Sequence, residues 1–190
     1  MSRADDLRWL AAAAHLAARG RPLSRPNPAV GAMIVKEGRV IARGWTQAGG
    51  RPHAEAIALA AAGDAACGAT LYVSLEPCAH ISARGPACAD LVAASMVSRV
   101  VVGCADPDPR TAGAGLARIA AAGMATSLID CPHSRASLAG YLSLRQKGRP
   151  HITLKLATSL DGCIATGQGQ SQWITGAQAR AHTHAMRARA

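Results

Sequence analysis

The chain has 190 residues, which is room for one ordinary domain with some sequence left over. Its residues are 49% hydrophobic with no Phe and only three Trp, so a core has to be built from Ala, Val, Leu and Ile. The formal net charge is +10, which suits anionic partners such as nucleic acid or a phosphorylated small molecule. The basic residues are scattered and form no long run, so solvated basic faces explain the charge at least as well.

The cysteines and the amino terminus indicate a compartment. The amino terminus leads straight into a helical pattern without a secretory signal core, and there is no long apolar span. Six cysteines in such a chain favour a reducing cytoplasm, so we expect a cytoplasmic protein with no membrane partner. Four of them have no partner at metal-ligand spacing and are expected to be ordinary thiols, namely Cys67, Cys104, Cys131 and Cys163.

The first elements are predicted to be a helix and a hairpin. Apolar residues recur at helical spacing from Asp5 to Arg19, and Gly20 ends the run. A turn is expected at residues 25–28, because two prolines bracket Asn27 and exclude a helix. Residues 29–35 and 39–43 then predict a β-hairpin.

The next stretch places polar residues at the ends of apolar elements. A glycine-rich loop at 48–52 leads to His53, and residues 54–62 predict a mostly apolar helix buried against a sheet. His53 and Glu55 therefore lie at a helix amino terminus. An apolar strand at 69–75 follows and delivers Glu76-Pro77-Cys78 at its carboxyl end, where open α/β sheets place their sites.

The remainder of the first domain alternates helices with strands. The predicted elements are a helix opened by Cys88 at 89–96, a strand at 99–104, a proline-rich turn at 106–109, a helix at 113–122, a strand at 124–129 and one helix at 132–147. This alternation predicts a central sheet with helices on its faces, and hence an α/β domain over residues 1–147.

The pattern restarts at residue 148. We expect an alternating strand at 151–157, a loop rich in Gly and Gln, and a helix from Thr175 or Gly176 to Ala190. Forty residues of this kind cannot close an independent core. Residues 148–190 are therefore expected to be the amino-terminal fragment of a second domain that is cut short.

One constellation carries chemistry, namely His53 with Glu55 and Cys78 with Cys88. One imidazole and two thiolates hold zinc well, and three protein ligands leave a fourth position for water, as in catalytic sites. Glu55 cannot easily bind the same ion as His53 because it is only two residues away, so it is expected to move the proton of that water to a leaving amino group. The set predicts a zinc-dependent base deaminase with one Zn²⁺ in the domain.

The alternative is a structural or incidental cluster, in which the histidine is a core residue and the cysteines act as small hydrophobic side chains. A structural zinc site more typically has four ligands in paired CxxC or HxxxH spacings. It would also leave Glu55 without a purpose, so the catalytic interpretation is favoured.

The order of the motifs resembles one family, the bifunctional riboflavin-biosynthesis deaminase/reductase. In the first domain the resemblance is carried by PNPAVG at 26–31, AGGRPHAE at 48–55, GATLYVSLEPCAH at 68–80 and DPDP at 106–109. Beyond it, LKLATSLDG at 154–162 and SQWIT at 171–175 resemble the opening of the family's reductase domain. The similarity covers essentially the whole chain, and finding both sets in this order is highly specific.

The resemblance implies a fold and an activity. The fold is a cytidine-deaminase-like three-layer domain with a central mixed sheet, followed by the first strand and helix of an α/β reductase domain. The activity is hydrolytic deamination of 2,5-diamino-6-(5-phosphoribosylamino)pyrimidin-4-one in riboflavin biosynthesis, so the partner is a phosphorylated pyrimidine. In the family, the carboxyl-terminal domain then reduces the ribosyl chain of the product with NADPH.

The resemblance also assigns site residues by motif position. Glu55 would be catalytic, and the zinc ligands would be His53, Cys78 and Cys88. The substrate contacts would be Asn27, His80, Arg84, Ser171 and Arg187, and the contacts to NADPH would be Ala157 and Trp173. Ordinary alternatives remain for several of these residues, such as a turn asparagine, a loop hydrogen bond, core packing or an exposed helix position.

Three features depart from the family pattern. The gap between Cys78 and Cys88 is one residue longer, which leaves the register of Arg84 open. Thr46 stands where the family often carries a histidine that contacts substrate. The sequence ends where the reductase should continue, so we expect NADPH-dependent reduction to be incomplete in this chain.

Two other functions stay open. A tRNA or other nucleic-acid base deaminase shares the HxE motif, but such enzymes have PCxxC spacing, whereas nine residues separate Cys78 from Cys88, so nucleic acid is not the expected partner. A non-catalytic zinc- or cofactor-binding remnant would fit the shortened second domain, although a decayed site would be expected to lose Glu55 first. The sequence allows a homo-oligomer and does not decide it.

Overall fold

The computed structural model describes residues 2–188, and the chain divides into two compact units, residues 1–151 and residues 152–190. Met1, Arg189 and Ala190 lie outside the described residues, and so does the predicted helix end at Ala190. In the described part of the chain no helix is both long and apolar enough to cross a membrane. The predicted domain boundary between residues 147 and 148 stays a prediction.

The first unit alternates strands and helices as the sequence predicts. Its strands are β1 (Gly31–Lys36), β2 (Arg39–Trp45), β3 (Thr70–Val73), β4 (Arg99–Val102) and β5 (Ala125–Leu128). Its α-helices are α1 (Arg3–Ala17), α2 (Ala54–Ala62), α3 (Cys88–Ala93), α4 (Ala114–Ala121), α5 (Pro132–Ser137) and α6 (Ala139–Lys147). Short 3-10 helices lie at Ala18–Gly20, Ala48–Gly50 and Gly63–Ala66.

The strands form one five-stranded sheet in the order β2-β1-β3-β4-β5. β1 pairs antiparallel with both β2 and β3, as the predicted hairpin requires. β3, β4 and β5 run parallel, because a crossover that contains α3 or α4 returns the chain to the same end of the sheet each time. The expectation of a mixed central sheet is therefore confirmed.

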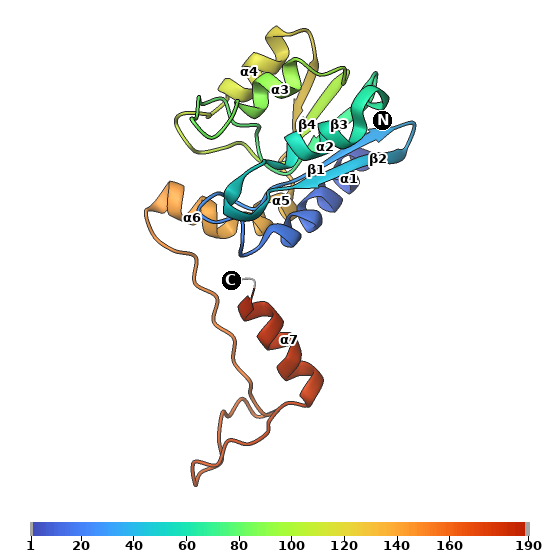
Figure 1. Cartoon of the computed structure of the whole chain (residues 1–190). Coiled ribbons are helices and arrows are strands. Elements are labelled where there is room, and N and C mark those ends of the chain that lie inside the picture. Colours follow the sequence, from blue (N-terminus) through green and yellow to red (C-terminus); the bar gives the residue numbers. More distant parts are fainter. Residues whose placement is uncertain (1, 189–190) are drawn as a thin grey trace. The chain divides into compact units, whose positions relative to one another are not determined.

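Helices cover both faces of this sheet (Figure 1). Successive side chains of a strand point to opposite faces, so Leu71 and Val73 join one core while Tyr72 joins the other. The first core also contains residues from α2, α3 and α4. In the second core, Leu10 of α1 packs against the sheet. This is the three-layer arrangement that the sequence predicts.

The topology brings the ends of two parallel strands to one edge of the sheet. The chain leaves β3 into Glu76-Pro77-Cys78 and leaves β4 into the DPDP turn that starts at Asp106. The carboxyl ends of neighbouring parallel strands lie side by side, so these two loops are neighbours.

The prediction of a single helix at 132–147 is wrong in one respect. The segment is helical, but it breaks at Leu138 into α5 and α6. Leu138 has φ −103° and ψ 6° and is buried in the first core together with Leu142. Helical periodicity alone continues through this point, but burial of both leucines turns α6 away from the line of α5. Tertiary packing overrides local preference here.

The second unit contains α7 (Ala177–Ala188) but not the predicted strand at 151–157, which is therefore a correction. A lone extended segment cannot satisfy its backbone N–H and C=O groups without a neighbouring strand, and none pairs with it among the described residues. No residue from 152 to 188 is buried. The expectation that this segment has no core of its own is confirmed.

One buried ion pair ties α1 to the sheet. The Asp6 carboxylate is 3% exposed and accepts hydrogen bonds from Tyr72 Oη at 2.8 Å and from Arg99 Nη1 and Nη2 at 2.9 and 2.8 Å. Burial raises the pKa of Asp6, but the hydrogen bonds from Arg99 and Tyr72 outweigh it and hold that pKa below its usual value. Because Tyr72 belongs to β3 and Arg99 to β4, this carboxylate joins three elements.

We expect Asp6→Asn to lower the free energy of unfolding at pH 7 by about 2–3 kcal/mol. The amide has only one acceptor oxygen, so it cannot accept the pair of hydrogen bonds that Arg99 donates to the two carboxylate oxygens. A carboxyl whose folded pKa is depressed stabilises the fold above its unfolded pKa of about 4, and this contribution is lost as the pH falls through the folded pKa. Urea unfolding at pH 7 and pH 3 should show that the difference in unfolding free energy between the variant and the wild type is smaller at pH 3. Asp64→Asn, at an exposed position, is the control, and a gap independent of pH would contradict this role.

Candidate active site

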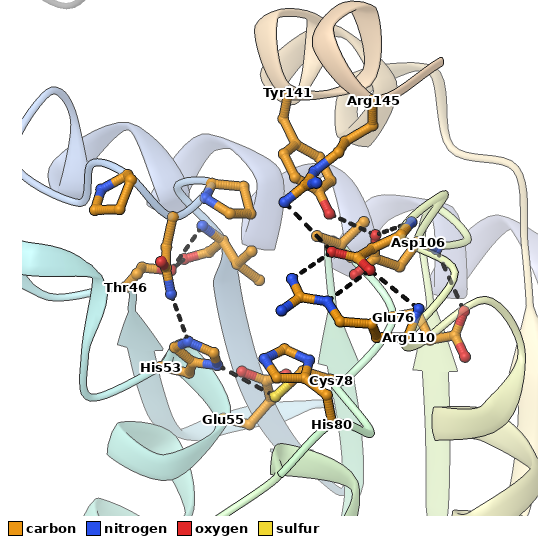
Figure 2. Close-up of a pocket in the computed structure, with 16 residues that line it drawn as sticks. Thr46, His53, Glu55, Glu76, Cys78, His80, Asp106, Arg110, Tyr141 and Arg145 are labelled. Atoms are coloured by element: carbon orange, nitrogen blue, oxygen red, sulfur yellow. Dashed lines mark hydrogen bonds and ion pairs between the residues drawn. The ribbon is translucent and has the colours of Figure 1, made fainter. Parts of the chain in front are cut away.

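A cleft of about 610 Å³, including its open mouth, lies at the carboxyl edge of β3 and β4 (Figure 2). Its lining comes from four parts of the first unit. These are the Pro26–Pro28 turn with the end of the hairpin, the start of α2, the loops that follow β3 and β4, and α6. Clefts at this edge of an α/β sheet commonly bind small molecules.

Three side chains at the floor of the cleft form a metal-binding set. One ligand atom from each of His53, Cys78 and Cys88 lies within 4.8 Å of the others. His53 Nδ1 is 3.2 Å from Cys88 Sγ and 3.6 Å from Cys78 Sγ. Usual zinc bond lengths and tetrahedral angles place nitrogen and sulfur ligands roughly 3.6 Å apart, so the set fits Zn²⁺.

Each ligand is placed by a different element. His53 is the residue immediately before α2, Cys78 follows β3, and Cys88 is the first residue of α3. The backbone N–H of Cys88 donates to Cys78 Sγ at 3.3 Å. Contacts with Cys88 and then His53 hold the pKa of Cys78 well below its usual range, which favours the thiolate form that zinc prefers.

Asn27 orients the imidazole of His53. Its Nδ2 lies 3.0 Å from His53 Nε2 and donates to the Gly50 carbonyl at 3.1 Å. A Cβ on Gly50 would come within 2.6 Å of the Asn27 side chain, and Gly50 has φ +87°, so glycine is required there for two reasons. Asn27 also lines the cleft.

Glu55 lies beside the metal-binding set in the first turn of α2. Its side chain lines the cleft, yet the residue is only 3% exposed. Burial raises the pKa of Glu55, and the nearby His53 opposes that shift without cancelling it. A raised pKa makes it easier for a carboxyl group to take up a proton, as general acid–base chemistry requires.

Glu76, which precedes Pro77 and Cys78, holds the next loop in place. Its Oε1 accepts from the N–H groups of Gly115 and Leu116, and its Oε2 from those of Asp106 and Gly113, at 3.1–3.3 Å. The first turn of α4 is thereby bound to the segment that carries Cys78. A Cβ on Gly115 would lie 2.1 Å from the Pro77 carbonyl, so this close approach also requires glycine.

The opposite wall of the cleft contains residues that the sequence reasoning missed. They are Asp106, Asp108, Arg110, Tyr141 and Arg145. Tyr141 Oη donates to Asp106 Oδ1 at 2.6 Å, and Arg110 donates through Nε and Nη2 to both oxygens of Asp108 at 2.9 and 2.6 Å. The DPDP turn was visible in the sequence, and its position after a parallel strand could have identified the two acids. No sequence signal shows which cleft α6 faces.

Three other residues of the first unit were singled out in the sequence, and the structure places them differently with respect to the cleft. His80 lines the cleft, and its Nδ1 is buried without a hydrogen-bond partner among the described residues. Arg84 is outside the cleft lining and instead donates to the Gly49 carbonyl, so it joins the two loops that carry His53 and Cys88. Thr46 is 1% exposed, and its Oγ1 accepts from the N–H of Val30 at 3.0 Å.

The four residues expected to serve a reductase lie together within the second unit. Ala157, Ser171, Trp173 and Arg187 all line one cavity formed by residues 155–187. Trp173 is 69% exposed and packs under the guanidinium of Arg180, whose Cζ is 4.2 Å from the ring centre. Their predicted contacts with NADPH and substrate stay predictions.

The fold and the metal-binding set define a class of protein. Residues 3–104 match the family model described as cytidine and deoxycytidylate deaminase zinc-binding region, and residues 150–190 match the RibD C-terminal domain. The chain therefore belongs to the cytidine and deoxycytidylate deaminase zinc-binding family.

Its relatives within that family are RibD proteins. The chain is 45% identical over 185 residues to the riboflavin biosynthesis protein RibD of Escherichia coli, and the match covers 97% of this chain and 50% of the relative. Acinetobacter baumannii RibD is 42% identical with a TM-score of 0.83, over 97% of this chain and 52% of that one. The predicted resemblance is confirmed, and the chain spans about half the length of the curated relatives it matches.

A Thermotoga maritima structure is also similar, with 37% identity and a TM-score of 0.86 over 96% of this chain and 53% of that chain. That protein is described as a diaminohydroxyphosphoribosylaminopyrimidine deaminase and 5-amino-6-(5-phosphoribosylamino)uracil reductase.

We expect Cys88→Ser to reduce bound zinc from about one ion per chain to a small fraction, because a hydroxyl is a much poorer zinc ligand than a thiolate. Metal analysis of the purified protein measures this directly. The control is Cys67→Ser, which changes an exposed cysteine outside the set. Unchanged zinc in Cys88→Ser would rule out ligation by this sulfur.

We expect Glu76→Gln to lower the free energy of unfolding by at least about 3 kcal/mol, because the amide replaces an acceptor with a donor facing backbone N–H groups. Chemical denaturation provides the measurement. Glu37→Gln is the matched control, since Glu37 is exposed in the hairpin turn. Equal stability of the two variants would show that the four hydrogen bonds do not hold the loop.

Proposed function

We propose that the first unit is a zinc-dependent hydrolase that removes the ring amino group of 2,5-diamino-6-(5-phosphoribosylamino)pyrimidin-4-one in riboflavin biosynthesis. The observation that carries the proposal is the meeting of His53, Cys78 and Cys88 beside the buried Glu55 in one cleft. Relatives named riboflavin biosynthesis protein RibD support the choice of substrate.

The roles of the residues follow from their positions. Zinc held by His53, Cys78 and Cys88 would lower the pKa of a water molecule to about 7. Glu55 accepts a proton from the attacking water and delivers it to a ring nitrogen of the pyrimidine. Glu55 then moves the second proton, from the hydroxyl group now bound to the ring carbon, to the amino group, which leaves as ammonia, so that C–NH₂ and H₂O become C=O and NH₃.

Asn27 and His80 are proposed to hold the pyrimidine. The amide of Asn27 can hydrogen-bond an edge of the ring, and the buried Nδ1 of His80 has no hydrogen-bond partner among the described residues. A buried polar atom without a partner costs free energy, so a ligand that supplies the missing hydrogen bond gains affinity. Both side chains line the cleft that also contains His53 and Cys78 of the metal-binding set.

Reduction with NADPH is not assigned to residues 152–188 by themselves. The match to the RibD C-terminal domain makes Ala157 and Trp173 proposed cofactor contacts, and Ser171 and Arg187 proposed substrate contacts. However, no residue of this segment is buried, and a nicotinamide site needs a packed wall on which to place the ring. The homo-oligomer that the sequence allows stays a proposal as well.

The proposed activity is tested by ammonia release from the diaminopyrimidine phosphate. Glu55→Gln should lower kcat by about 10²–10⁴-fold or more while zinc content stays unchanged, because the amide cannot carry the proton. An active Glu55→Gln variant would contradict the role of this carboxyl group. Excess tRNA should leave the wild-type rate unchanged, and inhibition by tRNA would favour a nucleic-acid base deaminase instead.

A further inference from the structure

Two arginines of the cleft have no part in the chemistry described above. Arg110 follows the DPDP turn, and Arg145 projects from α6, and both line the cleft. Figure 2 shows Arg145 reaching in from α6 at one end of the cleft, while His53 and Glu55 lie at the other end. The cleft thus has a reactive end and a cationic end.

Both guanidinium groups bind the same carboxylate. Arg110 uses Nε and Nη2 on Asp108, and Arg145 Nη2 lies 3.3 Å from Asp108 Oδ2. The Asp108 side chain is only 5% exposed, whereas the arginine side chains are 57% and 43% exposed. The two guanidinium groups are thus the exposed members of this cluster, and the carboxylate that holds them lies behind, so positive charge faces the open part of the cleft.

The other acids on this wall are already bound by the protein. Asp106 accepts from Tyr141 Oη and from the N–H of Asp108, and Glu76 accepts from four backbone N–H groups. Arg110 Nη1 and Arg145 Nη1 have no acceptor among the described residues. Donors that face a cleft without an acceptor are available to an anionic ligand.

We propose that Arg110 and Arg145 form an anion subsite that binds the phosphate monoester of the substrate, with Asp108 as the positioning residue that aims both guanidinium groups. The inference rests on the proposed function, because it assigns the phosphate of that same substrate. A guanidinium fork matches two phosphate oxygens, so two arginines can bind one phosphate group. In the substrate, the 5′-phosphate and the reacting amino group lie at opposite ends, as the cationic and reactive ends do in the cleft.

The rest of the cleft lining offers no comparable cation. Thr46 is buried with its hydroxyl bound to Val30, and Arg84 is turned to the Gly49 carbonyl outside the cleft lining. Among the described residues that line the cleft, Arg110 and Arg145 are the arginines, and no lysine is present. The phosphate is therefore expected to bind at the wall formed by the DPDP turn and α6.

The test compares ammonia release from the phosphorylated substrate and from its dephosphorylated form. Arg145→Ala should raise KM for the phosphorylated substrate about tenfold with kcat unchanged, and should leave KM for the dephosphorylated form unchanged. Arg145→Lys keeps the charge but not the fork and should recover part of the loss. The control is Arg118→Ala, because Arg118 has a similar exposed ion pair, with Asp90, away from the cleft.

Inorganic phosphate supplies a second measurement that does not depend on turnover of a poor substrate. It should inhibit the wild type competitively, and Arg145→Ala should weaken that inhibition. An equal rise of KM for both substrate forms, or unchanged inhibition by phosphate, would overturn the subsite and leave the arginines as partners of Asp108 alone. If the wild type releases no ammonia, the proposed function fails. Titration of the wild type and of Arg145→Ala with inorganic phosphate then still tests the subsite, because only the wild type should bind phosphate well.

Discussion

The geometry of the cleft depends on one buried carboxylate, that of Glu76. A buried charge is tolerated only when hydrogen bonds replace its lost hydration, and four backbone N–H groups do so here. Those donors come from the loop after β4 and the first turn of α4, whereas Glu76 precedes Cys78 by two residues. A single side chain therefore joins the floor of the cleft to the wall that contains Asp106 and Asp108.

The metal-binding set depends on the same kind of long-range support. Its three ligands come from the start of α2, the end of β3 and the start of α3, so no local segment could form it alone. Asn27 reaches across from the turn before β1 to hold the His53 ring, and Gly50 leaves space for that contact. Partners behind a metal ligand fix its orientation, which is why such contacts matter as much as the ligands.

The two ends of the cleft divide the work of binding and reaction. The end with Glu55 and the metal-binding set is buried and suits proton transfer, whereas the end with Arg110 and Arg145 is more exposed and suits an anion that arrives from water. Both ends lie within the first unit. The second unit has a cavity lined by the expected reductase residues but no buried core.

The sequence by itself determined the alternating fold, the mixed sheet and the zinc-type motif. The reason is that apolar periodicity and the His, Glu and Cys spacing are local signals, and tertiary contacts in the first unit left them in place except at Leu138. Only the tertiary structure decided the break at Leu138, the fate of residues 151–157 and the opposite wall of the cleft. Burial of Leu138 turned α6, the lone segment found no strand to pair with, and Arg145 met Asp108 across 37 residues of sequence because two separate elements pack together. Contacts of that kind depend on packing, which no single stretch of residues records.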